Sequence, residues 1–211
     1  MKNVITLLLF IVLFTLNSFA QPSPGGTPSN LTLWLDAKDG VETGGTSATD
    51  GGSIDSWINQ QINPGCIDLN QTTSSKMPTY RTNALNFNPI VEFDGSGDQL
   101  DRSVLGSDIF AASNNTIFFV HKYYSGIVYF KWEQGSSGNR VGFENSGGST
   151  RFDFPTDAIG NQTIGTFPFN TAGQIVTSTS NSSTSTLRNM GLQNTSNPTT
   201  GTLNTSFTSN L

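Results

Sequence analysis

Charged side chains are scarce in this chain of 211 residues. Lys and Arg together number 10 and Asp and Glu 15, so charged residues make up 12% of the sequence. Ordinary soluble domains contain about twice that share. The formal net charge is −5, and no cluster of basic side chains is present to neutralise phosphates. These two properties exclude a basic nucleic-acid-binding protein.

Cysteine and histidine are nearly absent, since Cys66 and His121 are the only residues of their types. A single cysteine excludes an internal disulfide, and we expect Cys66 to be a small, partly buried apolar residue. A single histidine excludes a metal site built from several histidines, and we expect His121 to lie at a strand end. The Gly-x-Ser-x-Gly elbow of serine hydrolases, the P-loop and the dinucleotide-binding fingerprint are also missing.

Small polar residues fill much of the sequence, with 25 Ser, 27 Thr, 21 Asn and 22 Gly. These types are mediocre or poor helix formers, which argues against a helical bundle. The apolar residues instead come in short runs bounded by Gly, Asn, Ser or Pro, a pattern typical of short antiparallel strands. We therefore predict an all-β antiparallel sandwich. The runs are residues 31–35, 90–93, 116–121, 126–132, 140–144, 151–154 and 174–179.

The N-terminus has the layout of a secretory signal peptide. A short basic start precedes an apolar segment over residues 4–14, and small side chains stand at Ser18 and Ala20. We expect a signal peptide over residues 1–20 and a Pro- and Gly-rich linker over residues 21–30. Because a membrane span needs about 20 apolar residues, we expect export with no membrane span after cleavage.

The C-terminal part has its own composition. From Thr171 to Leu211, 25 of 41 residues are Ser, Thr or Asn, and Arg188 carries the only charge. A low-complexity stalk is one interpretation. The spacing of apolar residues, such as Ile175 and Leu187, favours weak polar strands instead. The chain stops without a closing hydrophobic run, and we expect it to be a fragment of a longer protein with further domains.

An acidic, glycine-rich loop follows residues 90–93. Asp94, Asp98 and Asp101 could converge on Ca²⁺, which takes six to eight oxygen ligands, although the loop lacks the EF-hand pattern. A tight turn, with the Asp side chains accepting hydrogen bonds from backbone amides, explains the same residues. Both interpretations stay open here. We expect turn roles for the remaining acidic loop residues, Asp36, Asp39, Asp50 and Asp55.

Aromatic side chains are the candidate ligand-binding residues. Trp34 and Phe93 lie within apolar runs, and we expect them in the core. Tyr123 and Tyr124 follow a predicted strand and precede Ser125-Gly126, where they could stack on a sugar ring. Packing in the core or at a sheet edge is the alternative for any aromatic side chain.

Several segments resemble concanavalin A-like domains of the LamG type, found in large secreted bacterial surface proteins. The resemblance rests on Leu33-Trp34-Leu35-Asp36-Ala37, on Asp55-Ser56-Trp57 and above all on residues 83–100, and it extends over residues 31–211. It implies a jelly-roll fold and a lectin-like or adhesive role. The chain departs from the family after Trp57, where Asn59, Gln61 and Ile62 stand, and it lacks the last strands of the family domain.

The same superfamily contains polysaccharide hydrolases, whose strand carries a Glu-x-Asp-x-x-Glu arrangement. Here Glu92 and Asp94 are present, but Gly95, Ser96 and Gly97 follow and the second glutamate is missing. We therefore expect a non-catalytic module that binds a glycan or a surface protein. A structural spacer within a multidomain surface protein is the alternative, and a hydrolase is the third hypothesis.

Overall fold

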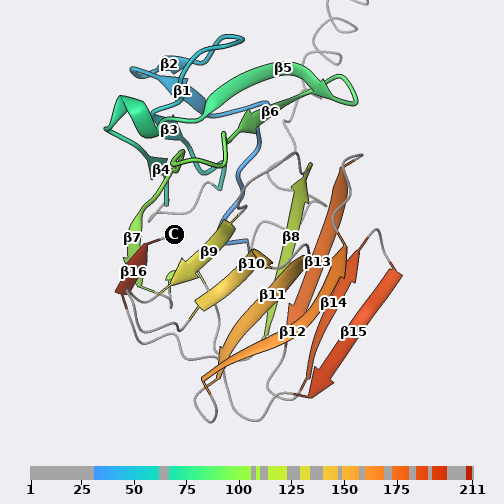
Figure 1. The fold of residues 1–211 in the computed structure, drawn as a ribbon. Coiled ribbons are helices and arrows are strands. Elements are labelled where there is room, and N and C mark those ends of the chain that lie inside the picture. The colour runs from blue at the N-terminus through green and yellow to red at the C-terminus, as the bar shows by residue number, and fades with distance from the viewer. Residues whose placement is uncertain are drawn as a thin grey trace, which may run out of the picture.

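Antiparallel β-strands dominate the computed structural model of the chain (Figure 1). The structure describes residues 31–61, 67–105, 108–109, 114–122, 129–133, 140–146, 149–156, 160–168, 173–180, 184–189, 192–198 and 208–210. Every strand pair within these residues is antiparallel. The prediction of an all-β chain with antiparallel sheets is thereby confirmed.

The strands are short, as the runs of the sequence predict. In chain order they are β1 (Val41–Thr43), β2 (Thr46–Ser47), β3 (Ser56–Trp57), β4 (Leu69–Asn70), β5 (Thr79–Leu85), β6 (Asn88–Glu92), β7 (Ser103–Leu105), β8 (Asn115–His121), β9 (Tyr129–Glu133), β10 (Arg140–Ser146), β11 (Ser149–Thr156), β12 (Gly160–Pro168), β13 (Gln174–Ser180), β14 (Thr184–Asn189), β15 (Leu192–Pro198) and β16 (Thr208–Asn210). A 3₁₀ turn, η3 (Ser74–Lys76), precedes β5.

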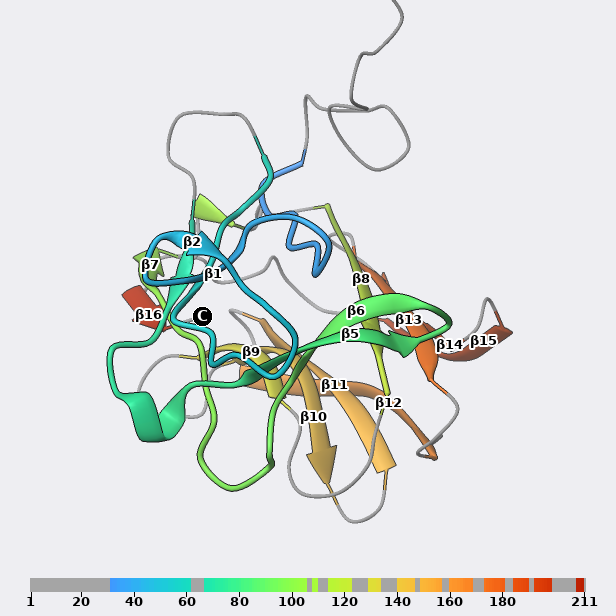
Figure 2. The same ribbon diagram turned by 90° about the horizontal axis from the view of Figure 1, so that it is seen from above.

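The strands form three sheets and a separate hairpin. The first sheet has the order β2-β1-β3-β4, the second β12-β11-β10-β9-β16-β7 and the third β15-β14-β13-β8, while β5 and β6 form a two-stranded hairpin. The second and third sheets meet where β12 lies against β14 and β15. Viewed from above, the β5–β6 hairpin lies over β8 and β13 (Figure 2).

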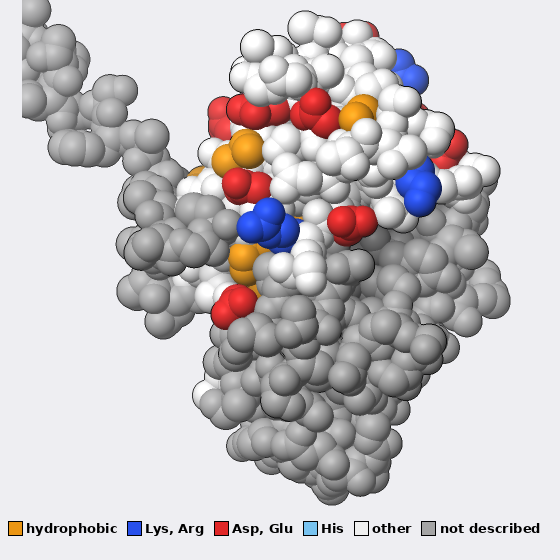
Figure 3. Space-filling view, turned by 90° about the vertical axis from the view of Figure 1, so that its left-hand side faces the viewer, with side chains coloured by type: hydrophobic (Ala, Val, Ile, Leu, Met, Phe, Trp, Pro, Cys, Tyr) orange, Lys and Arg blue, Asp and Glu red, His pale blue; other side chains and the backbone are white. Residues whose placement is uncertain are grey.

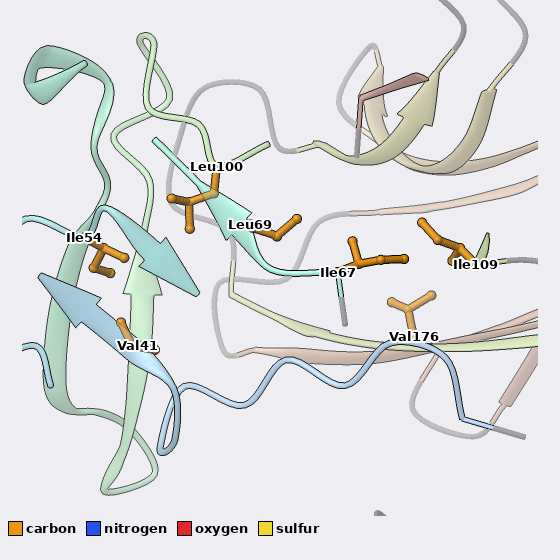
Figure 4. Packing of buried hydrophobic residues seen from close by; sticks show 7 residues of the cluster. All are labelled: Val41, Ile54, Ile67, Leu69, Leu100, Ile109 and Val176. Carbon is orange, nitrogen blue, oxygen red and sulfur yellow. The ribbon is translucent and has the colours of Figure 1, made fainter. Parts of the chain in front are cut away.

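A cluster of buried aliphatic side chains connects the first sheet to the third. Its members come from β1, β4 and β13 and from the loops between strands (Figure 4), and they are Val41, Ile54, Ile67, Leu69, Leu100, Ile109 and Val176. Ile54 and Val176 are completely buried. Because residues more than 100 positions apart in the sequence share this core, the segment before β8 is held against β13 by apolar packing.

The β8 strand alternates as its β-branched and aromatic sequence predicts. Ile117 and Phe119 pack against the buried cluster, whereas Phe118 and Val120 point to the opposite face and are exposed. This period of two is the property of a strand with one buried face. The neighbouring strand β13 has the same exposed face, because Val120 pairs with Ile175 and Ile175 is also half exposed.

Two expectations about particular segments can be compared with the described strands. The C-terminal part contains β13, β14, β15 and β16, which confirms strands there. Phe93, expected in the core, is 45% exposed, so that prediction is wrong. The reason is that β6 ends at Glu92. Val91 packs against the core, but Phe93 lies beyond the strand, so the alternation that would place both side chains on one face does not apply to it. No helix among the described residues is long and apolar enough to cross a membrane.

Candidate functional site

The β5–β6 hairpin ends in a tight two-residue turn. Leu85 pairs with Asn88 across the hairpin, so Asn86 and Phe87 form the tip. Both tip residues have positive φ angles, 48° for Asn86 and 64° for Phe87. Two consecutive left-handed residues define a type I′ turn, whose twist matches that of the flanking strands. Phe87 is 91% exposed, and its side chain therefore projects from the tip into solvent.

A bulge in β5 bends the hairpin just before its tip. Arg81 pairs with Ile90 and Leu85 with Asn88, so residues 82–84 lie opposite Pro89 alone. Proline has no N–H to donate, which favours a break in the ladder at this position. The bulged segment is fixed by Asp50, whose Oδ1 accepts a hydrogen bond from the Thr82 N–H at 2.8 Å. Bulges of this kind redirect the strand beyond them.

The bent hairpin meets the end of the third sheet. A Cβ added at Gly173, which precedes β13, would lie 3.2 Å from Leu85 Cδ1 and 3.9 Å from the carbonyl oxygen of His121. Leu85 therefore sits close to the residue that enters β13 and to the last residue of β8. Figures 1 and 2 show the same proximity from two directions. We call this junction of the hairpin tip with the ends of β8 and β13 the hairpin rim.

The sequence-predicted ligand residues Tyr123 and Tyr124 lie outside the described residues. They follow the last residue of β8 in the sequence by two and three positions. The structure places the β5–β6 tip near the last residue of β8, a proximity that the sequence analysis did not identify. The other predicted residues, Asp94, Asp98 and Asp101, lie in the loop after β6.

His121 closes β8 at the rim and is largely enclosed by protein. Its ring stacks on Phe119, with ring centroids 5.0 Å apart and an angle of 15° between the planes. Neither ring nitrogen has a hydrogen-bond partner among the described residues. Burial lowers the pKa of His121, because the charged form would be poorly solvated there. His121 is a strand-end residue, as predicted, and is neutral at physiological pH.

Acid is expected to weaken the fold through His121. An unfolded histidine has a pKa of about 6.5, and the folded pKa lies below it. The unfolded chain therefore binds more protons, so stability falls as the pH drops below about 6.5 and the loss is complete below the folded pKa. We expect His121→Phe, which keeps a ring against Phe119, to reduce the fall in urea midpoint between about pH 7.5 and about pH 5.

Asp50→Asn is the control for this pH experiment. The hydrogen bond from the Thr82 backbone lowers the pKa of Asp50. Its contribution is therefore present above the ordinary carboxyl pKa of about 3.9 and is lost only as the pH falls further, below the window used for histidine. An equal fall in midpoint for His121→Phe and the original chain would show that another group is responsible.

The acidic loop after β6 is organised by hydrogen bonds to its own backbone. Asp94 Oδ1 accepts a hydrogen bond from the Ser96 N–H at 2.7 Å, and Asp98 Oδ2 accepts one from the Asp94 N–H at 2.9 Å. Asp101 Oδ2 accepts from the Gln99 side chain. Among the described residues, no group of three or more His, Cys, Asp or Glu side chains is placed to share a metal ion. These contacts are those of the turn alternative, and calcium binding stays a hypothesis.

Other carboxylates near this part of the chain also have structural partners. Asp36 Oδ1 accepts from the Lys38 N–H, and Asp55 Oδ2 accepts from the Gly44 N–H, which confirms turn roles for both. Glu92 forms an ion pair of 2.6 Å with Arg81 on the neighbouring strand. Figure 3 shows acidic side chains spread among uncharged ones over one described face. None of these contacts gives Glu92 and Asp94 a shared catalytic geometry.

Asn59 and Gln61, the residues at which the sequence departs from the LamG pattern, are buried and bind the N-terminal segment. Asn59 Oδ1 accepts a hydrogen bond from the Trp34 N–H at 2.8 Å, and its Nδ2 donates to the Thr32 carbonyl at 3.1 Å. Gln61 Nε2 donates to the Leu31 carbonyl. A buried amide is stabilising when its donor and acceptor are both paired. Asn59 and Gln61 therefore have structural roles, which sequence polarity alone did not reveal.

Comparisons of the chain with protein-family models, with curated proteins and with solved structures gave no match.

Proposed function

We propose that this chain is an exported, non-catalytic, lectin-like module that binds glycans at the hairpin rim, and that its sheets are arranged as a concanavalin A-like jelly roll. The observation that carries the proposal is the contact of Leu85 with Gly173 beside the end of β8. This contact brings an exposed aromatic tip to the strand that leads into Tyr123 and Tyr124. Aromatic rings next to amides are suited to sugars, which have an apolar face and a rim of hydroxyl groups.

The electrostatics of the described residues support a neutral or weakly charged ligand. The turn and its flanking residues, from Thr82 to Pro89, contain no charged side chain. The carboxylates nearby are engaged in turn hydrogen bonds or, for Glu92, in an ion pair. A site without an available pair of carboxylates is suited to binding a sugar rather than to hydrolysing it.

A glycan array tests this proposal directly. We expect the purified chain to bind a subset of neutral glycans, and we expect the double change of Tyr123 and Tyr124 to alanine to weaken that binding by about tenfold, since each ring removes stacking contacts. Phe93→Ala is the matched control, because Phe93 is also an exposed aromatic but follows the other end of β6. It is expected to leave binding unchanged.

Calcium is included as a second arm of the same array. If Asp94, Asp98 and Asp101 hold Ca²⁺ that shapes the site, a chelator abolishes binding and added calcium restores it. Equal binding with and without calcium would mean that Asp94, Asp98 and Asp101 have only the turn role and do not hold Ca²⁺ for the site. Absence of binding to any glycan, with and without calcium, would overturn the lectin proposal and favour the spacer hypothesis.

A further inference from the structure

We infer that Phe87, a residue that sequence reasoning did not single out, is the ligand-contacting aromatic of the hairpin rim and stacks on the apolar face of a sugar ring. The inference rests on the proposed glycan-binding function and deepens it by naming the residue that makes the contact. It is carried by the conformation of Phe87, by its exposure, by the way the hairpin is fixed and by the neighbours of the ring.

The backbone conformation of Phe87 is unfavourable for its residue type. With φ at 64°, Phe87 occupies the left-handed region, where a Cβ crowds the following carbonyl oxygen. Asparagine tolerates this region, as Asn86 does at the preceding position, but a bulky side chain there is an outlier. The residue that suits the second position of this turn is glycine, and Asn-Gly is the preferred pair.

The side chain does not recover this cost by packing. Phe87 is 91% exposed, so almost none of its apolar surface is removed from water. Phe118 is also exposed, but it stands in β8, where an aromatic side chain suits the strand. Phe87 has neither burial nor strand propensity in its favour. A residue that weakens the fold at its own position is a candidate for a functional role.

Contacts of the strand that leads into the tip hold the hairpin that carries Phe87 in place. The Asp50 carboxylate holds the Thr82 N–H at 2.8 Å before the tip, and Arg81 pairs with Glu92 across the hairpin at 2.6 Å. Leu85 lies against Gly173 at the rim. A site held on rigid elements positions its side chain without a large ordering cost upon binding.

The neighbours of Phe87 favour a sugar over a protein partner. Asn86 and Asn88 flank the ring in sequence, and the Asn88 side chain donates a hydrogen bond to the Asn86 carbonyl at 3.0 Å. The remaining amide oxygen of Asn88 is an acceptor suited to hydroxyl groups. A protein-binding hot spot requires a ring of further contacts that exclude water, whereas one aromatic face beside amides matches a single sugar ring.

Phe87→Gly separates the ligand role from a structural role, because glycine suits the turn. We expect this variant to bind the glycans recognised by the original chain about tenfold more weakly. We also expect its thermal midpoint to be unchanged or to rise by about 1–4 °C, since the strain at position 87 is removed. Phe87→Tyr, which keeps the ring, is the matched control and is expected to retain binding within about threefold.

The outcomes distinguish this inference from the proposed function. If the original chain binds glycans and Phe87→Gly binds them equally well, the role of Phe87 is overturned while the lectin proposal stands. A fall in thermal midpoint together with the loss of binding would show that Phe87 supports the fold, which also overturns the inference. If the original chain binds no glycan, both the proposed function and the sugar contact of Phe87 are overturned. Binding of a partner protein by the original chain but not by Phe87→Gly would then assign Phe87 to a protein interface.

Discussion

Replacing Ile54 with alanine is expected to lower the free energy of unfolding by about 2–5 kcal/mol. Ile54 has no exposed surface and belongs to the cluster that joins the first sheet to β13. Its neighbours are fixed, because the Ile54 N–H donates to the carbonyl of Pro78 at 2.8 Å and Pro78 is itself fully buried. A rigid surrounding collapses little around a deleted side chain, so most of the cavity remains.

Equilibrium urea unfolding measures this loss, and Ile175→Ala is the matched control. Ile175 undergoes the same truncation but is half exposed on the outer face of β13. We expect its substitution to cost only about 0.5–1 kcal/mol, since less apolar area returns to water and no cavity forms. Equal losses for the two variants would contradict the assignment of the core to the cluster around Ile54.

Strands with one buried face could be located from the sequence. Residues 116–121 alternate between outward and inward side chains because β8 packs one face on the core, and that alternation was visible as a run of β-branched and aromatic residues. The same rule failed for Phe93, because the periodicity of a sequence does not indicate where the ladder of hydrogen bonds ends. The turn role of Asp36 could be predicted, since short acidic side chains bind backbone amides two residues further along the chain. The amide that Asp55 binds belongs to Gly44, eleven positions away, and local sequence does not indicate that partner.

The hairpin rim could not be predicted in the same way. Asn86-Phe87 lacks the glycine by which a type I′ turn is recognised, and Pro89 argues against a strand at the position it occupies in β6. The contact of Leu85 with Gly173 joins residues 88 positions apart, and no local pattern encodes it. The glycine at position 173 is the only local signal of this contact, and glycine is abundant throughout this chain.

Among the glycines that the structure describes, Gly40 is the one where a single methyl group is expected to be most disruptive. Gly40→Ala should lower the free energy of unfolding by about 2–4 kcal/mol, as the sum of two costs. The first is backbone strain, because the φ of Gly40 is 78°. The second is steric, because the added Cβ would lie 2.9 Å from the Ile58 carbonyl oxygen and would also meet the Gln60 side chain.

The steric part of this cost cannot be relieved locally, and Gly45→Ala isolates it. The Ile58 N–H donates to the Gly40 carbonyl at 2.7 Å, so moving the Ile58 backbone away breaks a hydrogen bond that fixes the loop before β1. Gly45 has nearly the same φ, 76°, but a Cβ there would meet no atom within 4 Å. Gly45→Ala therefore carries the strain alone, about 1–2 kcal/mol. Urea unfolding of both variants measures their losses of stability, and the difference between the two losses is the steric cost. A difference near zero would mean that the backbone at Ile58 moves aside freely. The hydrogen bond to Gly40 would then not hold the loop in place.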